Sequence, residues 1–63
     1  MLSQNIKRLR KKKGISQEKM ARLADVSVNT IVKIENGANQ NPTIETLIKV
    51  TKALDVEIGD LIK

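Results

Sequence analysis

Hydrogen-bonding side chains recur at the spacing of one helix face at Asn29, Lys33 and Asn36. On a helical wheel with about 100° per residue, all three point away from the apolar side marked by Ile31. Asn can form two hydrogen bonds with adenine, Lys can donate to guanine, and Val28 on the flank can touch a thymine methyl group. An outward polar face is also typical of any solvated helix. Other parts of the chain must therefore show whether this face binds DNA.

The positive charge lies almost entirely in the first half of the chain. The formal net charge is +5, from twelve Lys and Arg against seven Asp and Glu. Residues 1–33 hold nine basic and two acidic side chains, whereas residues 34–63 hold three basic and five acidic ones. The first half is therefore expected to attract a polyanion. The alternative is that its basic residues form only a solvated helix face. The densest cluster is Lys7, Arg8, Arg10, Lys11, Lys12 and Lys13.

Composition excludes several classes of function. With 63 residues, the chain is expected to form a single domain, 1–63, because one this short has only a small core. It has no Cys and no His, which removes the commonest metal ligands and catalytic bases, so we expect no cofactor, no metal and no enzyme. It has no aromatic ring on which single-stranded bases could stack. It has no apolar run of membrane-spanning length and no signal-peptide core, so we expect a cytoplasmic protein without a membrane partner.

Apolar spacing predicts a compact all-α fold of five helices. Leu2, Ile6 and Leu9 recur at i, i+4 and i+7, which is one face of a helix. The five helices are expected over residues 2–13, 17–24, 28–36, 44–54 and 57–62. The predicted inner faces of the second and third are Met20, Ala21, Leu23 and Ala24, and Ser27, Ile31, Ile34 and Glu35.

Capping residues mark where these helices begin and end. Ser16, Ser27 and Thr43 are good N-caps, because their side-chain oxygens can accept a hydrogen bond from the first turn. Gly14 and Gly37 follow the first and third helices and tolerate positive φ.

A helix–turn–helix pattern occurs twice. Residues 23–28 and 53–58 are similar strings, and each joins two helices through a turn of about three residues. Both can be simple helix corners. The second unit carries Asp55, Glu57 and Asp60, which would repel phosphate, so the first unit is the candidate for entering a DNA groove.

Several strings match a known family in order and spacing. They are residues 16–24, 26–31, 34–37, 42–47 and 53–56. With these strings the chain resembles the phage repressor/Cro family of helix–turn–helix proteins, from about Leu2 to Leu61. The resemblance implies a five-helix, lambda-repressor-like domain with the helix–turn–helix at its second and third helices. The third helix, about residues 28–36, would lie in the major groove of double-stranded operator DNA while the second crosses the backbone.

The resemblance also implies roles for individual residues. The expected phosphate contacts are Gln17, Asn36 and Asn39. The residues expected to reach base edges, or to lie beside them, are Ser27, Val28, Asn29, Thr30 and Lys33. Separately from the resemblance, the positive charge of the first helix predicts that Lys12 contacts the DNA backbone whatever the base sequence.

Two further expectations concern structure. Arg10 and Glu35 match a pair that bridges helices one and three, and the wheel agrees, since Arg10 lies on the inner face of the first helix. Asp25 and Asp55 stand where the family usually or often has Gly, at a position that tends to need positive φ. Asp is one of the few other residues that adopts this conformation, so the fold should be unchanged.

The expected function is that of a sequence-specific transcriptional regulator, a repressor. An antitoxin or a restriction–modification controller on the same fold is the alternative. A basic module that binds a protein or a membrane surface is a remote one. We expect a homodimer at least on DNA, because the last helix, with Ile58, Leu61 and Ile62, has more apolar residues than it can bury. A toxin partner and a further C-terminal domain both stay open.

Overall fold

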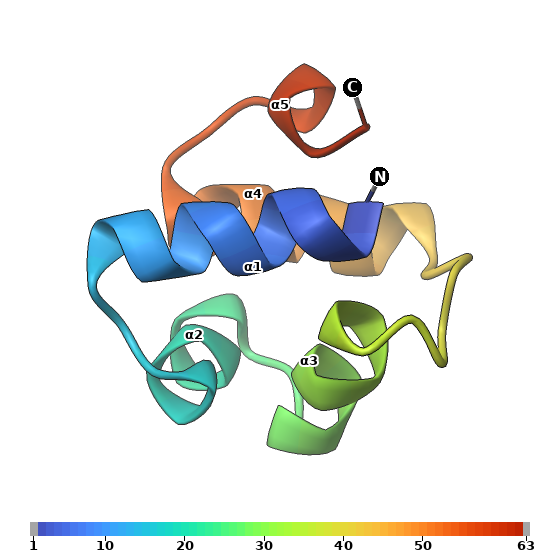
Figure 1. Ribbon diagram of the computed structural model, residues 1–63, viewed down its shortest axis with the longest axis horizontal. Coiled ribbons are helices and arrows are strands. Elements are labelled where there is room, and N and C mark those ends of the chain that lie inside the picture. Colours follow the sequence, from blue (N-terminus) through green and yellow to red (C-terminus); the bar gives the residue numbers. More distant parts are fainter. Residues whose placement is uncertain (1, 63) are drawn as a thin grey trace.

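The computed structural model describes residues 2–62 and contains five α-helices in that range (Figure 1). They are α1 (Leu2–Lys13), α2 (Gln17–Ala24), α3 (Val28–Glu35), α4 (Ile44–Leu54) and α5 (Ile58–Ile62). The all-α class and the number of helices were predicted correctly. Two boundaries differ by one residue: α3 ends at Glu35, with Asn36 as its C-cap, and α5 begins at Ile58.

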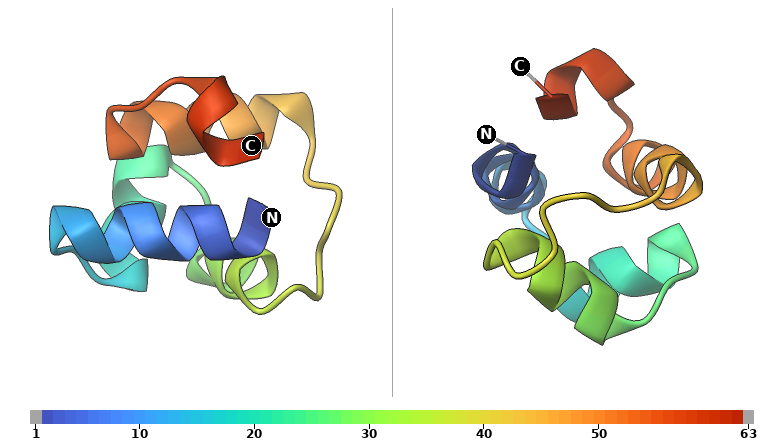
Figure 2. Two further views of the ribbon diagram at one scale, coloured as in Figure 1. Left: turned by 45° about the horizontal axis from the view of Figure 1, so that its top comes forward. Right: turned by 90° about the vertical axis from the view of Figure 1, so that its right-hand side faces the viewer.

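The helices form three levels around one core. The long helices α1 and α4 occupy the middle, with α2 and α3 on one side and α5 on the other (Figures 1 and 2). The first helix–turn–helix unit, α2 and α3, therefore forms one face of the molecule, whereas the second unit contributes α4 to the middle level and α5 to the opposite face.

The three predicted N-caps are confirmed. The hydroxyl groups of Ser16, Ser27 and Thr43 each accept a hydrogen bond from the backbone N–H three residues later, at 3.0–3.1 Å. Each cap satisfies one of the donors that a helix start leaves without an intrahelical partner. The start of α3 is thus set by its own sequence.

The two interhelical turns have the same conformation. Asp25 has φ 57° and ψ 45°, and Asp55 has φ 56° and ψ 48°, so both adopt the predicted left-handed conformation. In each turn the next N–H bonds back to a carbonyl five residues earlier: Val26 to Ala21 at 3.0 Å and Val56 to Thr51 at 3.1 Å. These bonds satisfy carbonyl groups at the helix end and hold the following helix at a fixed angle.

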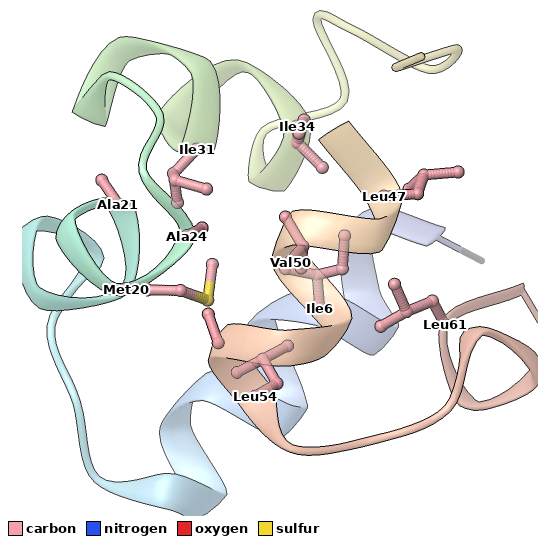
Figure 3. Packing of buried hydrophobic residues seen from close by; sticks show 11 residues of the cluster. Ile6, Met20, Ala21, Ala24, Ile31, Ile34, Leu47, Val50, Leu54 and Leu61 are labelled. Carbon is pink, nitrogen blue, oxygen red and sulfur yellow. The ribbon is translucent and has the colours of Figure 1, made fainter. Parts of the chain in front are cut away.

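All five helices contribute to the core (Figure 3). Its largest fully buried side chains are Ile6, Met20, Ile31, Ile34, Val50 and Leu61. Two residues that were predicted to face inward are exposed instead, so these predictions were wrong. Leu23 is 48% exposed, because Met20 and two alanines already fill the inner face of α2. Ser27 is exposed as well, because its hydroxyl caps the backbone of α3.

In residues 2–62, the helices are too short or too polar for any of them to cross a bilayer.

The left-handed turn residues lead to a stability prediction. A Cβ atom in this conformation costs roughly 1 kcal/mol, and glycine avoids that cost. We therefore expect Asp55→Gly to have a free energy of unfolding about 1 kcal/mol higher than Asp55→Ala, as measured by urea denaturation. Equal stabilities for the two variants would contradict the strain at this position.

Candidate nucleic-acid interface

The outer face of α3 carries the side chains that the wheel placed there. Asn29 and Lys33 are exposed, and Val28 is 42% exposed at the start of the helix. The opposite side of α3 is buried, with Ile31 and Ile34 in the core. The helix therefore presents a short row of amide, ammonium and methyl groups on a rigid, packed support.

Ser27 and Thr30 border this row and hold its first turn in place. The Ser27 Oγ accepts from the Thr30 N–H at 3.1 Å, and the two hydroxyl groups lie 2.9 Å apart. Ser27 is exposed and Thr30 is half-buried. Both hydroxyls are therefore engaged within the helix start, at the edge of the face that Asn29 occupies.

The predicted pair of Arg10 and Glu35 is present. The Arg10 Nε donates to Glu35 Oε2 at 2.7 Å, and its Nη2 donates to Oε1 at 3.1 Å. The third nitrogen, Nη1, donates to the carbonyl of Ile15 at 2.8 Å. Glu35 is only 4% exposed, so this bidentate contact lies at the edge of the core.

A third residue, Gln17, joins this ion pair, and the sequence interpretation missed that contact. The Gln17 Nε2 donates to Glu35 Oε1 at 3.0 Å. The signal was available in the helical spacing, because Gln17 precedes the buried Met20, Ala21 and Ala24 by three, four and seven residues. An amide NH₂ group carries two protons, so the second remains for a phosphate.

The network of Arg10, Gln17 and Glu35 links three helices at one point. It joins the last turn of α1, the first residue of α2 and the last residue of α3. No buried side-chain nitrogen or oxygen in residues 2–62 lacks a partner, so this buried carboxylate is fully satisfied. The network therefore fixes the start of α2 and the end of α3 relative to each other.

The loop after α3 is organised by its own amides. The Asn36 Oδ1 accepts from the Ala38 N–H at 2.8 Å, and the Asn39 Oδ1 accepts from the Asn41 N–H at 3.1 Å. The Asn39 N–H also donates to the carbonyl of Lys33 at 3.0 Å. These bonds use the oxygen end of each amide, which leaves the NH₂ groups as the ends that can donate to an anion.

A cavity of about 350 Å³ lies between this loop and the start of α1. Its lining residues are Leu2, Ser3, Asn36, Gly37, Asn39 and Gln40. No sequence pattern indicated this contact, because the two segments are far apart in the chain. The cavity shows that Ser3 of α1 faces the loop that follows α3.

The structure brings most of the predicted residues to one end of the molecule. Figure 1 shows α2 and α3 together on the side of α1 away from α5, and the bond from Gln17 to Glu35 joins the start of α2 to the end of α3, where the loop begins. Lys12 stands apart from them on α1, where it is exposed among other cations.

A helix–turn–helix that presents polar residues on its second helix is typical of DNA-binding proteins. The chain belongs to the helix-turn-helix family, whose model matches residues 6–61. The resemblance inferred from the sequence strings is thereby confirmed.

Individual relatives agree with this class. The chain is similar to the HTH-type transcriptional regulator SinR of Bacillus subtilis (strain 168), with 39% identity over 62 residues, covering 98% of the chain and 56% of SinR. It is 38% identical over 61 residues to the regulator SlrR of the same organism, covering 97% of the chain and 40% of SlrR. The chain thus spans about half the length of these relatives.

A solved structure matches over nearly its whole length. The restriction-modification controller protein C.AhdI from Aeromonas hydrophila superposes with a TM-score of 0.92 at 31% identity. The match covers 97% of this chain and 91% of that one. The five-helix arrangement is therefore shared with a controller protein.

The buried network leads to a second stability prediction. Arg10→Met leaves the Glu35 carboxylate buried without its cation, which should cost about 3 kcal/mol of unfolding free energy. Lys11→Met, at an exposed neighbouring position, removes the same charge and should change stability little. Thermal and urea unfolding of both variants measure the difference. Equal melting temperatures would show that Arg10 acts only as a surface charge.

Proposed function

We propose that this protein is a sequence-specific, double-stranded DNA-binding transcription regulator. The observation that carries the proposal is the exposed row of Val28, Asn29 and Lys33 on α3, the second helix of a helix–turn–helix. Helices of this kind enter the major groove, where their side chains contact base edges. The similarity to SinR and SlrR, both named as transcriptional regulators, supports the same function.

The contacts divide into two kinds under this proposal. Val28, Asn29 and Lys33 contact base edges, and Ser27 and Thr30 lie at the margin of that contact. Gln17, Asn36 and Asn39 hold the phosphate backbone on the two sides of the groove. The start of α2 suits this role, because the exposed N–H groups and the dipole of a helix start favour an anion. Binding a duplex in this way requires no catalysis, so we propose a non-enzymatic role in the cytoplasm, where the protein would repress transcription.

A restriction–modification controller is the second candidate. The match to C.AhdI favours it, because that protein shares the five-helix arrangement over nearly its entire length. A controller would use the same α3 surface, so the two candidates differ in the genes regulated and not in the chemistry of binding.

We further propose that residues 1–63 act as one DNA-binding unit that pairs with a second copy on DNA. Four exposed isoleucines lie on α4 and α5, outside α2 and α3: Ile44 at 64%, Ile48 at 43%, Ile58 at 40% and Ile62 at 63%. One recognition helix covers only a few base pairs, and a dimer with two-fold symmetry doubles that length.

Substitution of an exposed isoleucine tests the pairing. Ile62→Asp should weaken self-association without unfolding the protein, because the side chain is already 63% exposed. Analytical ultracentrifugation, with and without a palindromic duplex, measures the effect. Leu23→Asp, on α2, is the control, because it also replaces a half-exposed apolar side chain (48% exposed) with an acid but lies outside α4 and α5. An unchanged mass for the Ile62 variant on and off DNA would place the interface elsewhere.

Specificity should depend on Asn29 more than on total charge. Each good base contact discriminates by about 1–3 kcal/mol. Asn29→Ala should therefore weaken binding to a duplex selected from a random pool and leave a scrambled duplex nearly unaffected. Lys33→Ala should weaken both, the selected duplex more, because an ammonium group can reach a base or a phosphate.

Titration of the wild type and both variants against labelled duplexes provides the measurement. An equal loss on the two duplexes for Asn29→Ala would mean that α3 does not discriminate between bases. Tighter binding to single strands than to duplex would contradict the proposed function itself.

A further inference from the structure

The first helix carries several exposed cations across the width of its solvent-facing side. Lys7, Arg8, Lys11 and Lys12 are all exposed along α1. At about 100° per residue these four positions span about 140° of the helix circumference, so they cover the solvent-facing side from one flank to the other. Contacts of α1 with its neighbours show which side each of them occupies.

One flank of α1 faces α3 and its following loop. Arg10 binds Glu35, the last residue of α3, at 2.7 Å. Ser3 lines the cavity beside Asn36 and Asn39. These two contacts, seven residues apart on α1, mark the flank nearest the proposed DNA surface.

The opposite flank of α1 faces α5. The Asn5 Nδ2 donates to the carbonyl of Leu61 at 2.8 Å. The unit that contains α5 is acidic, with Glu57 just before it and Asp60 within it. Figure 1 places α5 on the side of α1 away from α3, so this flank is far from the proposed DNA surface.

Helical spacing assigns the four cations to these flanks. Lys7 and Lys11 follow Ser3 by four and eight residues, so they lie on the side that faces α3. Arg8 and Lys12 follow Asn5 by three and seven residues, so they lie on the side that faces α5.

We propose that Lys7 and Lys11 are the cations of α1 that contact the DNA phosphate backbone, and that Lys12, the residue expected from the sequence, is not. This inference rests on the proposed function, because it concerns the same bound duplex. Together with Gln17, Asn36 and Asn39, the two lysines extend the phosphate-binding surface from the start of α2 and the loop after α3 onto the side of α1.

Two double variants with the same change in charge test the assignment. Lys7→Gln/Lys11→Gln removes the pair on the α3 side, and Arg8→Gln/Lys12→Gln removes the pair on the α5 side. Binding to a labelled mixed-sequence duplex is measured between about 50 and 200 mM salt, where phosphate contacts dominate affinity. Each lost contact flattens the slope of log K against log salt by about 0.9.

The expected result is a slope flattened by about 1.8 per bound subunit for Lys7→Gln/Lys11→Gln, with weaker binding at low salt. Arg8→Gln/Lys12→Gln should keep most of the wild-type slope, since its charges lie on the far flank. Lys7→Arg/Lys11→Arg should restore the slope. Circular dichroism melting checks that every variant is folded.

Equal flattening by the two glutamine variants would overturn the assignment, because the cations would then act only through net charge. A larger effect of Arg8→Gln/Lys12→Gln would also overturn it, by placing the backbone on the α5 side. If the wild type shows no salt-dependent binding to duplex, the proposed function fails before the lysines are compared. The two failures are therefore distinguishable.

Discussion

The arrangement of the candidate surface depends on one buried carboxylate. Glu35 is 4% exposed and is held by two nitrogens of Arg10 and one of Gln17. A charge in such a place is tolerated only when it is paired and hydrogen-bonded, so the three helices must meet in one geometry. Since Gln17 begins α2 and Glu35 ends α3, the same bonds set the distance between the start of α2 and the end of α3.

The second constraint is the left-handed aspartate that joins each pair of helices. Asp25 and Asp55 have nearly the same φ and ψ and the same pattern of backbone bonds. The two units therefore share a local conformation and differ in their side chains. Asn29 and Lys33 follow the first turn, whereas Glu57 and Asp60 follow the second. A common backbone unit thus gives one surface suited to a polyanion and one that disfavours it.

Local signals in the sequence predicted the helices and the caps correctly, because each depends on a few adjacent residues. The left-handed turns at Asp25 and Asp55 and the Arg10–Glu35 pair were predicted through the family resemblance. Contacts between distant segments that lack such a pattern were missed, such as the bond from Gln17 to Glu35 and the cavity between Ser3 and the loop. Leu23 and Ser27 were placed wrongly because a wheel ranks direction only. It does not register that Met20, Ala21 and Ala24 already fill the inner face of α2, or that a capping hydroxyl binds the backbone at the helix start.

The basic run at the end of α1 has a role that does not require DNA. Arg10, Lys11, Lys12 and Lys13 form the last turn of the helix, where carbonyl groups without intrahelical partners leave a partial negative charge. Cations there stabilise a helix by about 0.3–1 kcal/mol each at low salt. Lys12 therefore has a structural reason for its charge although it faces the α5 side. Lys7 lies a full turn earlier, where this effect has faded, so the helix dipole does not account for its charge.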